Sequence, residues 1–342
     1  MLRRAGRWFL ESGIQDSGGG VARYYLNAEA RALPVSTEIT GYAASTFAYL
    51  FTRTGEQVYL DRARLAAQFL TGTAWNAELE TFPFELAEGS PGYFFDCGII
   101  VRGLLAVWRL TREPRLLEIA HAAGRSMARD YFTAGAIHPV IALPSRQPWP
   151  YEKRWSRQPG CFQLKGALAW RDLEDPALTE CWKGALAHAI ASDCGFLPGG
   201  GERVKVMDRL HAYCYYMEAL LAERSPLLQA AIPRTAGYLR DIAPEFARSD
   251  VYAQLLRVRL FADASGIVPL DRDAAAEEAA AVAGFQYSTP DPRLDGGYCF
   301  GRRAGELLPY VNPVSTGFCL QALDMWEQHR AGGFMPDLAA LI

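Results

Sequence analysis

Apolar residues recur with the spacing of an α-helix along most of the chain, and few stretches alternate strictly between apolar and polar positions. One set of predicted helices is apolar on nearly all sides, which is typical of buried helices. These helices cover residues 41–53, 96–111, 161–172, 210–223, 250–263 and 315–328.

A second set of predicted helices has one apolar and one charged face, which is typical of surface helices. They cover residues 58–71, 114–130, 176–192, 226–242 and 271–284 and alternate with the buried set. The connections that lead back to buried helices, such as 72–95, 131–160 and 285–314, are long, and long loops in compact domains are usually functional. The pattern predicts an all-α fold of six helical hairpins in one domain, residues 1–342, with the long loops at the N-terminal ends of the inner helices.

The tetrapeptide Pro-Val-Ser-Thr occurs twice, at residues 34–37 and 313–316, and each copy follows a Gly-Gly pair. Each stands where a long loop turns into a buried helix. Since Ser and Thr accept hydrogen bonds from the free N–H groups of a first helical turn, we expect both copies to be helix caps. They would then align the first and last hairpins.

Three N-terminal segments resemble a known superfamily. They are GGGVARYY at 18–25, STEITGY at 36–42 and TGEQVYLDRARLAAQFL at 54–70. They are similar to six-hairpin (α/α)6 proteins, and in particular to toroid proteins encoded with bacterial exopolysaccharide genes. The resemblance implies an (α/α)6 toroid that is glycosidase-like and acts on carbohydrate.

The composition limits the kinds of binding partner and the cell compartment that we expect for this protein. The net charge is −3 and Lys and Arg are scattered, so we expect neither nucleic acid nor an anionic membrane surface as a partner. No apolar run is long enough for a membrane span or a signal peptide, which favours a soluble cytoplasmic protein. Seven cysteines without a CxxC pair read as reduced, mostly buried thiols. No metal or cofactor motif is found, so neither is expected, and the oligomeric state is open.

Candidate catalytic residues cluster at the predicted starts of the inner helices, where free N–H groups and the helix dipole suit anionic or hydroxylated ligands. Glu38 and Asp96 are placed to form a carboxylate pair of the kind that hydrolyses glycosidic bonds. His211 and Tyr215 share one helical face and are suited to moving a proton. A capping or structural role for each is the alternative.

Candidate substrate-binding residues occupy similar places. Aromatic rings pack on the apolar faces of sugars, Arg302 could hold a carboxylate, and Asn312 could polarise it. The set is Tyr42, Tyr93, Phe94, Gln163, Tyr213, Arg302, Tyr310 and Asn312.

The leading hypothesis is a carbohydrate-active enzyme acting on an oligosaccharide or exopolysaccharide, with hydrolysis by Glu38 and Asp96. A uronate lyase or C5-epimerase that uses His211 and Tyr215 is the first alternative. A noncatalytic glycan-binding toroid is the second. The third is a metal-dependent prenyltransferase-like or peptide-modifying enzyme, for which the run from Asp295 to Cys299 resembles half of a zinc site but lacks a downstream histidine.

Overall fold

The computed structural model describes residues 1–133, 136–198 and 202–342, and this part of the chain is mainly helical. Twelve α-helices are present in it, and all the helices predicted from the apolar pattern are among them. The helices are α1 (Leu2–Glu11), α2 (Thr37–Thr54), α3 (Gln57–Gln68), α4 (Phe94–Thr111), α5 (Pro114–Tyr131), α6 (Leu164–Asp172), α7 (Pro176–Ser192), α8 (Arg203–Leu220), α9 (Leu228–Ile242), α10 (Ser249–Ala264), α11 (Arg272–Ala283) and α12 (Pro313–Arg330).

Strands are short and lie in the connections between helices, so the predicted all-α class is confirmed. The described strands are β1 (Val21–Ala22), β2 (Tyr25–Leu26), β3 (Arg31–Ala32), β4 (Val35–Ser36), β5 (Gly92–Tyr93), β6 (Phe132–Thr133), β7 (Ala136–Ile137), β8 (Val140–Ile141), β9 (Phe246–Arg248), β10 (Gly301–Arg303), β11 (Glu306–Leu307) and β12 (Tyr310–Val311). Among them, β10 pairs with β9 and β11, and β2 pairs with β12 and β3, all antiparallel.

The chain forms two compact units with six α-helices each. The first unit contains Met1–Gln15, Ala22–Leu33 and Leu197–Ile342, and the second contains Asp16–Val21 and Pro34–Phe196. The first unit therefore holds α1 and α8 to α12, and the second holds α2 to α7. The expectation of a single domain over residues 1–342 stays a prediction.

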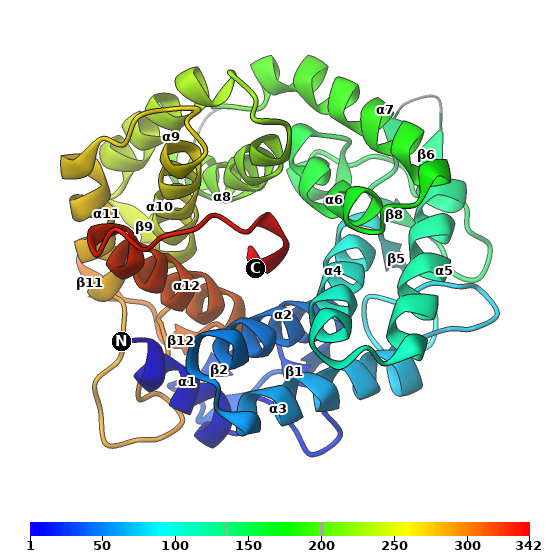
Figure 1. Cartoon of the computed structure of the whole chain (residues 1–342), viewed down its shortest axis with the longest axis horizontal. Coiled ribbons are helices and arrows are strands. Elements are labelled where there is room, and N and C mark those ends of the chain that lie inside the picture. The colour runs from blue at the N-terminus through cyan, green and yellow to red at the C-terminus, as the bar shows by residue number, and fades with distance from the viewer. Residues whose placement is uncertain (134–135, 199–201) are drawn as a thin grey trace. The chain divides into compact units, whose positions relative to one another are not determined.

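In the second unit the buried helices α2, α4 and α6 lie side by side, with backbone in contact at glycines (Figure 1). A Cβ added at Gly103 would lie 2.4 Å from the carbonyl oxygen of Gly41, and one added at Gly98 would lie 2.2 Å from that of Gly166. Helices α3, α5 and α7 pack on α2, α4 and α6 respectively. The predicted alternation of buried and surface helices is thereby confirmed in this unit.

In the first unit α8, α10 and α12 are the buried helices, and α9, α11 and α1 pack against them (Figure 1). The sequence missed α1, because its buried Trp8 and Phe9 are too few to give a clear period. Several buried polar residues of this unit pair with one another. Arg257, which is fully buried, donates to Glu218 and, at 2.8 Å, to Gln321 Oε1.

The start of α8 differs from the expectation. The helix begins at Arg203, whereas the apolar pattern placed its start at residue 210. The charged residues of its first two turns hid the helical period. His211 is therefore not at a helix start, as predicted, but well inside α8, where the free N–H groups of a first turn are out of reach.

The two Pro-Val-Ser-Thr copies do not play the same part. Ser36 caps α2 by accepting from the N–H of Ile39 at 3.5 Å. Helix α12 is capped by Asn312, whose Oδ1 accepts from the N–H groups of Val314 at 2.8 Å and Ser315 at 3.2 Å. The second copy lies inside the helix, so the prediction that its Ser or Thr caps α12 is wrong.

A repeat is nevertheless present, and it aligns on the capping residues. Four residues after each cap, Thr40 and Thr316 donate to the carbonyl of their own capping residue, at 2.7 and 2.9 Å. The same two hydroxyls accept from the backbone N–H that follows the Gly-Gly pair, at Val21 (2.9 Å) and Tyr298 (3.0 Å). The loop and the helix start are thus tied together by one device in both units.

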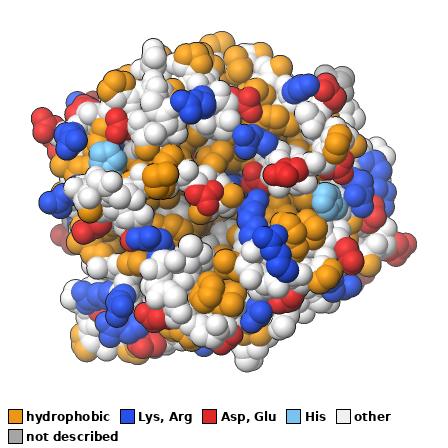
Figure 2. Space-filling model, in the orientation of Figure 1, with side chains coloured by type: hydrophobic (Ala, Val, Ile, Leu, Met, Phe, Trp, Pro, Cys, Tyr) orange, Lys and Arg blue, Asp and Glu red, His pale blue; other side chains and the backbone are white. Residues whose placement is uncertain are grey.

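The charged side chains are distributed, and the cysteines are mostly buried, as the composition predicted. Basic and acidic side chains are interspersed on the face shown in Figure 2. All seven cysteines lie in described ranges and are free; five are buried, Cys181 is half-buried and Cys194 is exposed.

Within residues 1–133, 136–198 and 202–342, no helix has both the length and the apolar character to span a bilayer.

Replacement of Gly103 by Ala should lower the free energy of unfolding by about 1–3 kcal/mol, because the new methyl group meets the backbone of α2. The matched control is Gly237→Ala in the interior of α9, where no atom lies within 4 Å of the added Cβ. That change should raise stability by up to about 1 kcal/mol. Urea titration of both variants measures the difference, and equal behaviour would contradict the glycine contact.

Replacement of Asn312 by Ala should destabilise the protein by about 1 kcal/mol through loss of the cap on α12. Ser315→Ala is the matched control, because the buried Ser315 hydroxyl has no hydrogen-bond partner among the described residues. This second change should leave the melting temperature unchanged or slightly higher. Thermal unfolding of the two variants distinguishes the caps, and a larger loss from Ser315→Ala would refute the assignment to Asn312.

Candidate active site

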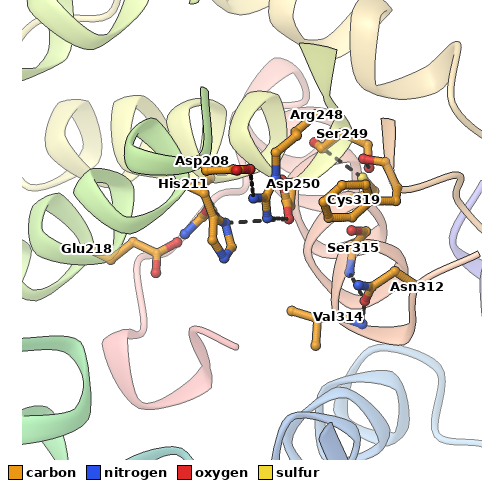
Figure 3. Close-up of polar contacts among 12 residues, drawn as sticks. Asp208, His211, Glu218, Arg248, Ser249, Asp250, Asn312, Val314, Ser315 and Cys319 are labelled. Atoms are coloured by element: carbon orange, nitrogen blue, oxygen red, sulfur yellow. Dashed lines mark hydrogen bonds and ion pairs between the residues drawn. The ribbon is translucent and has the colours of Figure 1, made fainter. Parts of the chain in front are cut away.

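Polar side chains from two buried helices of the first unit converge around His211 (Figure 3). Asp208 and His211 are three residues apart on α8, and Asp250 and Gln254 are four apart on α10. Such spacings place side chains on the same helical face. Because α8 and α10 pack against each other, the two faces meet.

Arg248 organises the acidic side of this cluster. It is the N-cap residue of α10, and its guanidinium donates to both oxygens of Asp250, from Nε (3.0 Å) and from Nη2 (2.6 Å). Its third nitrogen, Nη1, donates to Asp208 at 2.9 Å. Strand pairing of Arg248 with Gly301 and the ring of Phe300, 4.4 Å from the guanidinium carbon, hold the side chain in place. Each of the three guanidinium nitrogens of Arg248 therefore has a carboxylate partner.

His211 is held from one side and open on the other. Its Nδ1 lies 2.8 Å from Gln254 Oε1 and 3.5 Å from Asp250 Oδ2, and its ring meets the Tyr215 ring edge-on at 4.6 Å. Its Nε2 makes no hydrogen bond to any described residue, and 13% of the side chain is exposed. Of the two ring nitrogens, Nε2 is thus the one that a bound molecule could reach.

The electrostatics keep the imidazole neutral. Burial lowers the pKa of His211 to about 4, against the opposing pull of Asp250 and with a further lowering by Arg248. Burial alone would raise the pKa of Asp250, but Arg248 and His211 outweigh it and the pKa lies below its usual value. At neutral pH the cluster thus holds a neutral His211 beside the ion pair of Asp250 and Arg248.

Such an arrangement can accept a proton. A neutral imidazole with one nitrogen fixed and the other unbonded is a general base, and after protonation it is a general acid. The adjacent carboxylates would stabilise the imidazolium that forms. Arg248 is not assigned a role in binding an anionic substrate, because its three nitrogens donate to Asp208 and Asp250.

The other predicted residues of the first unit have different surroundings. Tyr213 faces Arg234 on α9, with the guanidinium carbon 5.6 Å from its ring, while Tyr215 is beside His211. Arg302 donates to the carbonyl of Gly284 at 3.1 Å. Tyr310 stacks on Phe300 with 5.2 Å between ring centroids, and Phe300 in turn contacts Arg248. Asn312 is the α12 cap described above.

Glu38, Tyr42, Asp96, Tyr93, Phe94 and Gln163 belong to the second unit. Glu38 and Asp96 are in the first turns of the neighbouring helices α2 and α4, half-buried and buried respectively. The carboxylate pair that they were predicted to form stays a prediction. Phe94 is fully buried and packs edge-on against Trp170 at 5.3 Å, which is a core contact.

The positions of the remaining three also follow from the helix starts. Tyr42 and Gln163 are buried, and Tyr93 caps α4 with its ring 5.1 Å from that of Phe84. Their proposed contacts with substrate are untested and remain predictions.

Sequence reasoning did not select Arg248 or Gln254 as functional residues. Gln254 could have been found as a polar residue in an otherwise apolar helix, one turn after Asp250. Arg248 offered only its place directly before a helix. Among the described residues no group of three or more His, Cys, Asp or Glu side chains could hold a metal ion.

Comparison with solved structures places this geometry in context. No protein-family model and no curated protein matches the sequence. The cellobiose 2-epimerase of Spirochaeta thermophila is similar in structure, with a TM-score of 0.71, 14% identity, and 92% of each chain covered. A D-mannose isomerase gives 0.69 at 9% identity, covering 94% of this chain and 96% of its own. An unsaturated glucuronyl hydrolase of Streptococcus agalactiae gives 0.66 at 8% identity, covering 98% and 92%.

These enzymes are six-hairpin proteins of the glycosidase-like superfamily. The chain has their (α/α)6 fold. The predicted fold class is thereby confirmed, as is the resemblance to six-hairpin proteins as far as it concerns the fold. At such low identities the (α/α)6 fold alone is established, and the chemistry has to be argued from the residues of the site.

Stability should depend on pH through His211. The folded-state pKa of about 4 lies below the ordinary value of 6.5, so between these values the unfolded chain binds a proton that the folded chain does not. The free energy of unfolding should therefore rise as pH increases from about 4 to 6.5, by up to about 3 kcal/mol. Urea titrations over this range, compared with His211→Asn, measure the effect. An unchanged pH slope in the variant would show that His211 does not cause it.

Proposed function

We propose that this protein is a carbohydrate-active enzyme that transfers a proton at the carbon next to a sugar carbonyl or carboxylate, with His211 as the base. The observation that carries the proposal is the state of His211. It is a neutral histidine whose Nδ1 is engaged by Gln254 and whose Nε2 has no partner among the described residues.

The proposed step is balanced within the sugar. Nε2 takes the proton from the carbon, the electron pair of the C–H bond moves into the adjacent carbonyl, and an enolate forms. Protonation of the same carbon on its other face, by water there or by His211 after the enolate has rotated, gives an epimer. Return of the proton to the neighbouring carbon, while the proton of the adjacent hydroxyl passes to the former carbonyl oxygen, gives an isomer. Loss of a leaving group from the β-carbon instead would give a lyase.

Support for this class comes from two sides. The solved structures that share the fold include a cellobiose 2-epimerase and a D-mannose isomerase. In addition, both carboxylates of the cluster already bind Arg248, which leaves His211 as the group free to react. An oligosaccharide is the proposed substrate; an exopolysaccharide chain as that substrate, a bacterial source and a cytoplasmic location remain predictions from the sequence.

Hydrolysis by Glu38 and Asp96 is the second candidate. Its support is that the two carboxylates stand in the first turns of adjacent buried helices, and that a glucuronyl hydrolase shares the fold. A glycosidase requires two carboxyl groups flanking the scissile bond. The two candidates use different units of the chain and are separable by mutation.

Deuterium exchange tests the proposal. Incubated in D2O with cellobiose, mannose or a uronate oligosaccharide, the protein should exchange the proton α to the carbonyl or carboxylate of at least one of them. His211→Ala should lower the rate on the order of 10²- to 10⁴-fold. His329→Asn is the control, because that histidine pairs with Asp263 at 2.9 Å, outside the cluster.

Proton NMR of the sugars measures the exchange. Full exchange in His211→Ala, or none with any of the three sugars, would contradict the proposal. Release of reducing ends that is lost in Glu38→Gln and Asp96→Asn would establish hydrolysis instead.

A further inference from the structure

Gln254 is buried in α10 among apolar residues, and its side chain meets His211. We infer that Gln254 is a positioning residue that fixes the tautomer of His211, keeping the proton on Nδ1 so that Nε2 faces the substrate as the base. The catalytic part of this inference rests on the proposed function; the tautomer itself does not.

The orientation of the Gln254 amide follows from its neighbours. Two groups face Nδ1 of His211, the amide at 2.8 Å and a carboxylate oxygen of Asp250 at 3.5 Å. The carboxylate is ionised and can only accept, so Nδ1 carries the hydrogen and the amide presents its oxygen. A neutral imidazole has a single N–H, which leaves Nε2 with a lone pair.

Gln254, rather than Asp250, is the group that holds the ring. Both oxygens of Asp250 are occupied by Arg248, at 3.0 and 2.6 Å, and the carboxylate is the more distant of the two acceptors. An amide oxygen orients the imidazole without adding a negative charge, whereas a carboxylate in direct contact favours the imidazolium. Gln254 therefore fixes the ring and leaves it neutral.

The burial of Gln254 is hard to explain by packing. The residue is fully buried, and its Nε2 has no hydrogen-bond partner within the described ranges. A buried donor left unsatisfied costs about 1–3 kcal/mol, so an apolar residue of similar length would be more stable here. The hydrogen bond to His211 is the one contact that requires a polar side chain at this place.

Charged groups on each packed element act on the same ring. They are Asp208 from α8, Arg248 from β9 and Asp250 from α10. Of these groups Asp250 is the one near Nδ1, at 3.5 Å, and the guanidinium of Arg248 compensates the charge of Asp250. A substitution at Gln254 should thus change the tautomer or the protonation of the His211 imidazole directly.

Nitrogen NMR of protein labelled with ¹⁵N-histidine tests the inference without any substrate. At pH 7 the intact protein should give a pyrrole-type shift for Nδ1 of His211 and a pyridine-type shift for Nε2. The signals that vanish in His211→Asn identify the ring, and those of His121, His138, His188 and His329 serve as internal references.

Two variants of Gln254 separate its roles. Gln254→Met keeps the length but removes the nearer acceptor and leaves Nδ1 only the carboxylate of Asp250 at 3.5 Å. The share of the Nε2–H tautomer should therefore rise, with the proton-exchange rate falling on the order of 10- to 100-fold at an unchanged KM. Gln254→Glu keeps the shape but adds a charge, so the titration midpoint of His211 should move up and the acid limb of the rate with it. Gln229→Met on the surface of α9 should change neither.

The outcomes are distinct from those for the proposed function. The inference is overturned if His211 carries its proton on Nε2 in the intact protein, or if Gln254→Met leaves the tautomer unaltered. If Gln254→Met does not fold, the tautomer of the intact protein and the titration of Gln254→Glu decide the matter. The predicted tautomer without deuterium exchange from any sugar would uphold the role of Gln254 and refute the proposed function.

Discussion

The site of the first unit depends on the ion pair between Arg248 and Asp250. A carboxylate as buried as Asp250 needs a compensating charge, and without the guanidinium the nearest cation it could create is a protonated His211. With the guanidinium bound through two nitrogens, the carboxylate is neutralised and the imidazole remains an uncharged base. The charge state of the histidine thus depends in part on a residue that does not touch its ring.

Helical geometry supplies the rest of the arrangement. Asp208, His211 and Tyr215 follow one face of α8, and Asp250 and Gln254 follow one face of α10. The short strands β9 and β10 then place Arg248 at the N-terminal end of α10, with its guanidinium over the ring of Phe300. Rigid elements therefore carry all the polar groups of the cluster, which is the condition for holding a base within hydrogen-bond reach of a fixed atom.

Much of this architecture could be read from the sequence. The buried and surface helices were predicted from apolar periodicity, and His211 with Tyr215 from helical spacing. Two features of the helices were not predicted, each for a local reason. Helix α1 has too few apolar residues to be recognised, and the charged first turns of α8 concealed where that helix starts. Contacts such as that of Arg248 with Asp208, forty residues apart, have no local signal.

The capping repeat has a consequence for how such a chain can change. Aligned on their caps, the two helix starts are offset by 312 − 36 = 276 residues, so Glu38 corresponds to Val314 and Tyr42 to Phe318. The backbone device is the same in both, while the residue two positions after the cap is a carboxylate in one and an isopropyl group in the other. The residues that close a hairpin are thus different from the residue that gives the first turn its charge. In a fold built in this way, a substitution two positions after the cap changes the chemical character of a helix start and leaves the ties that close the hairpin intact.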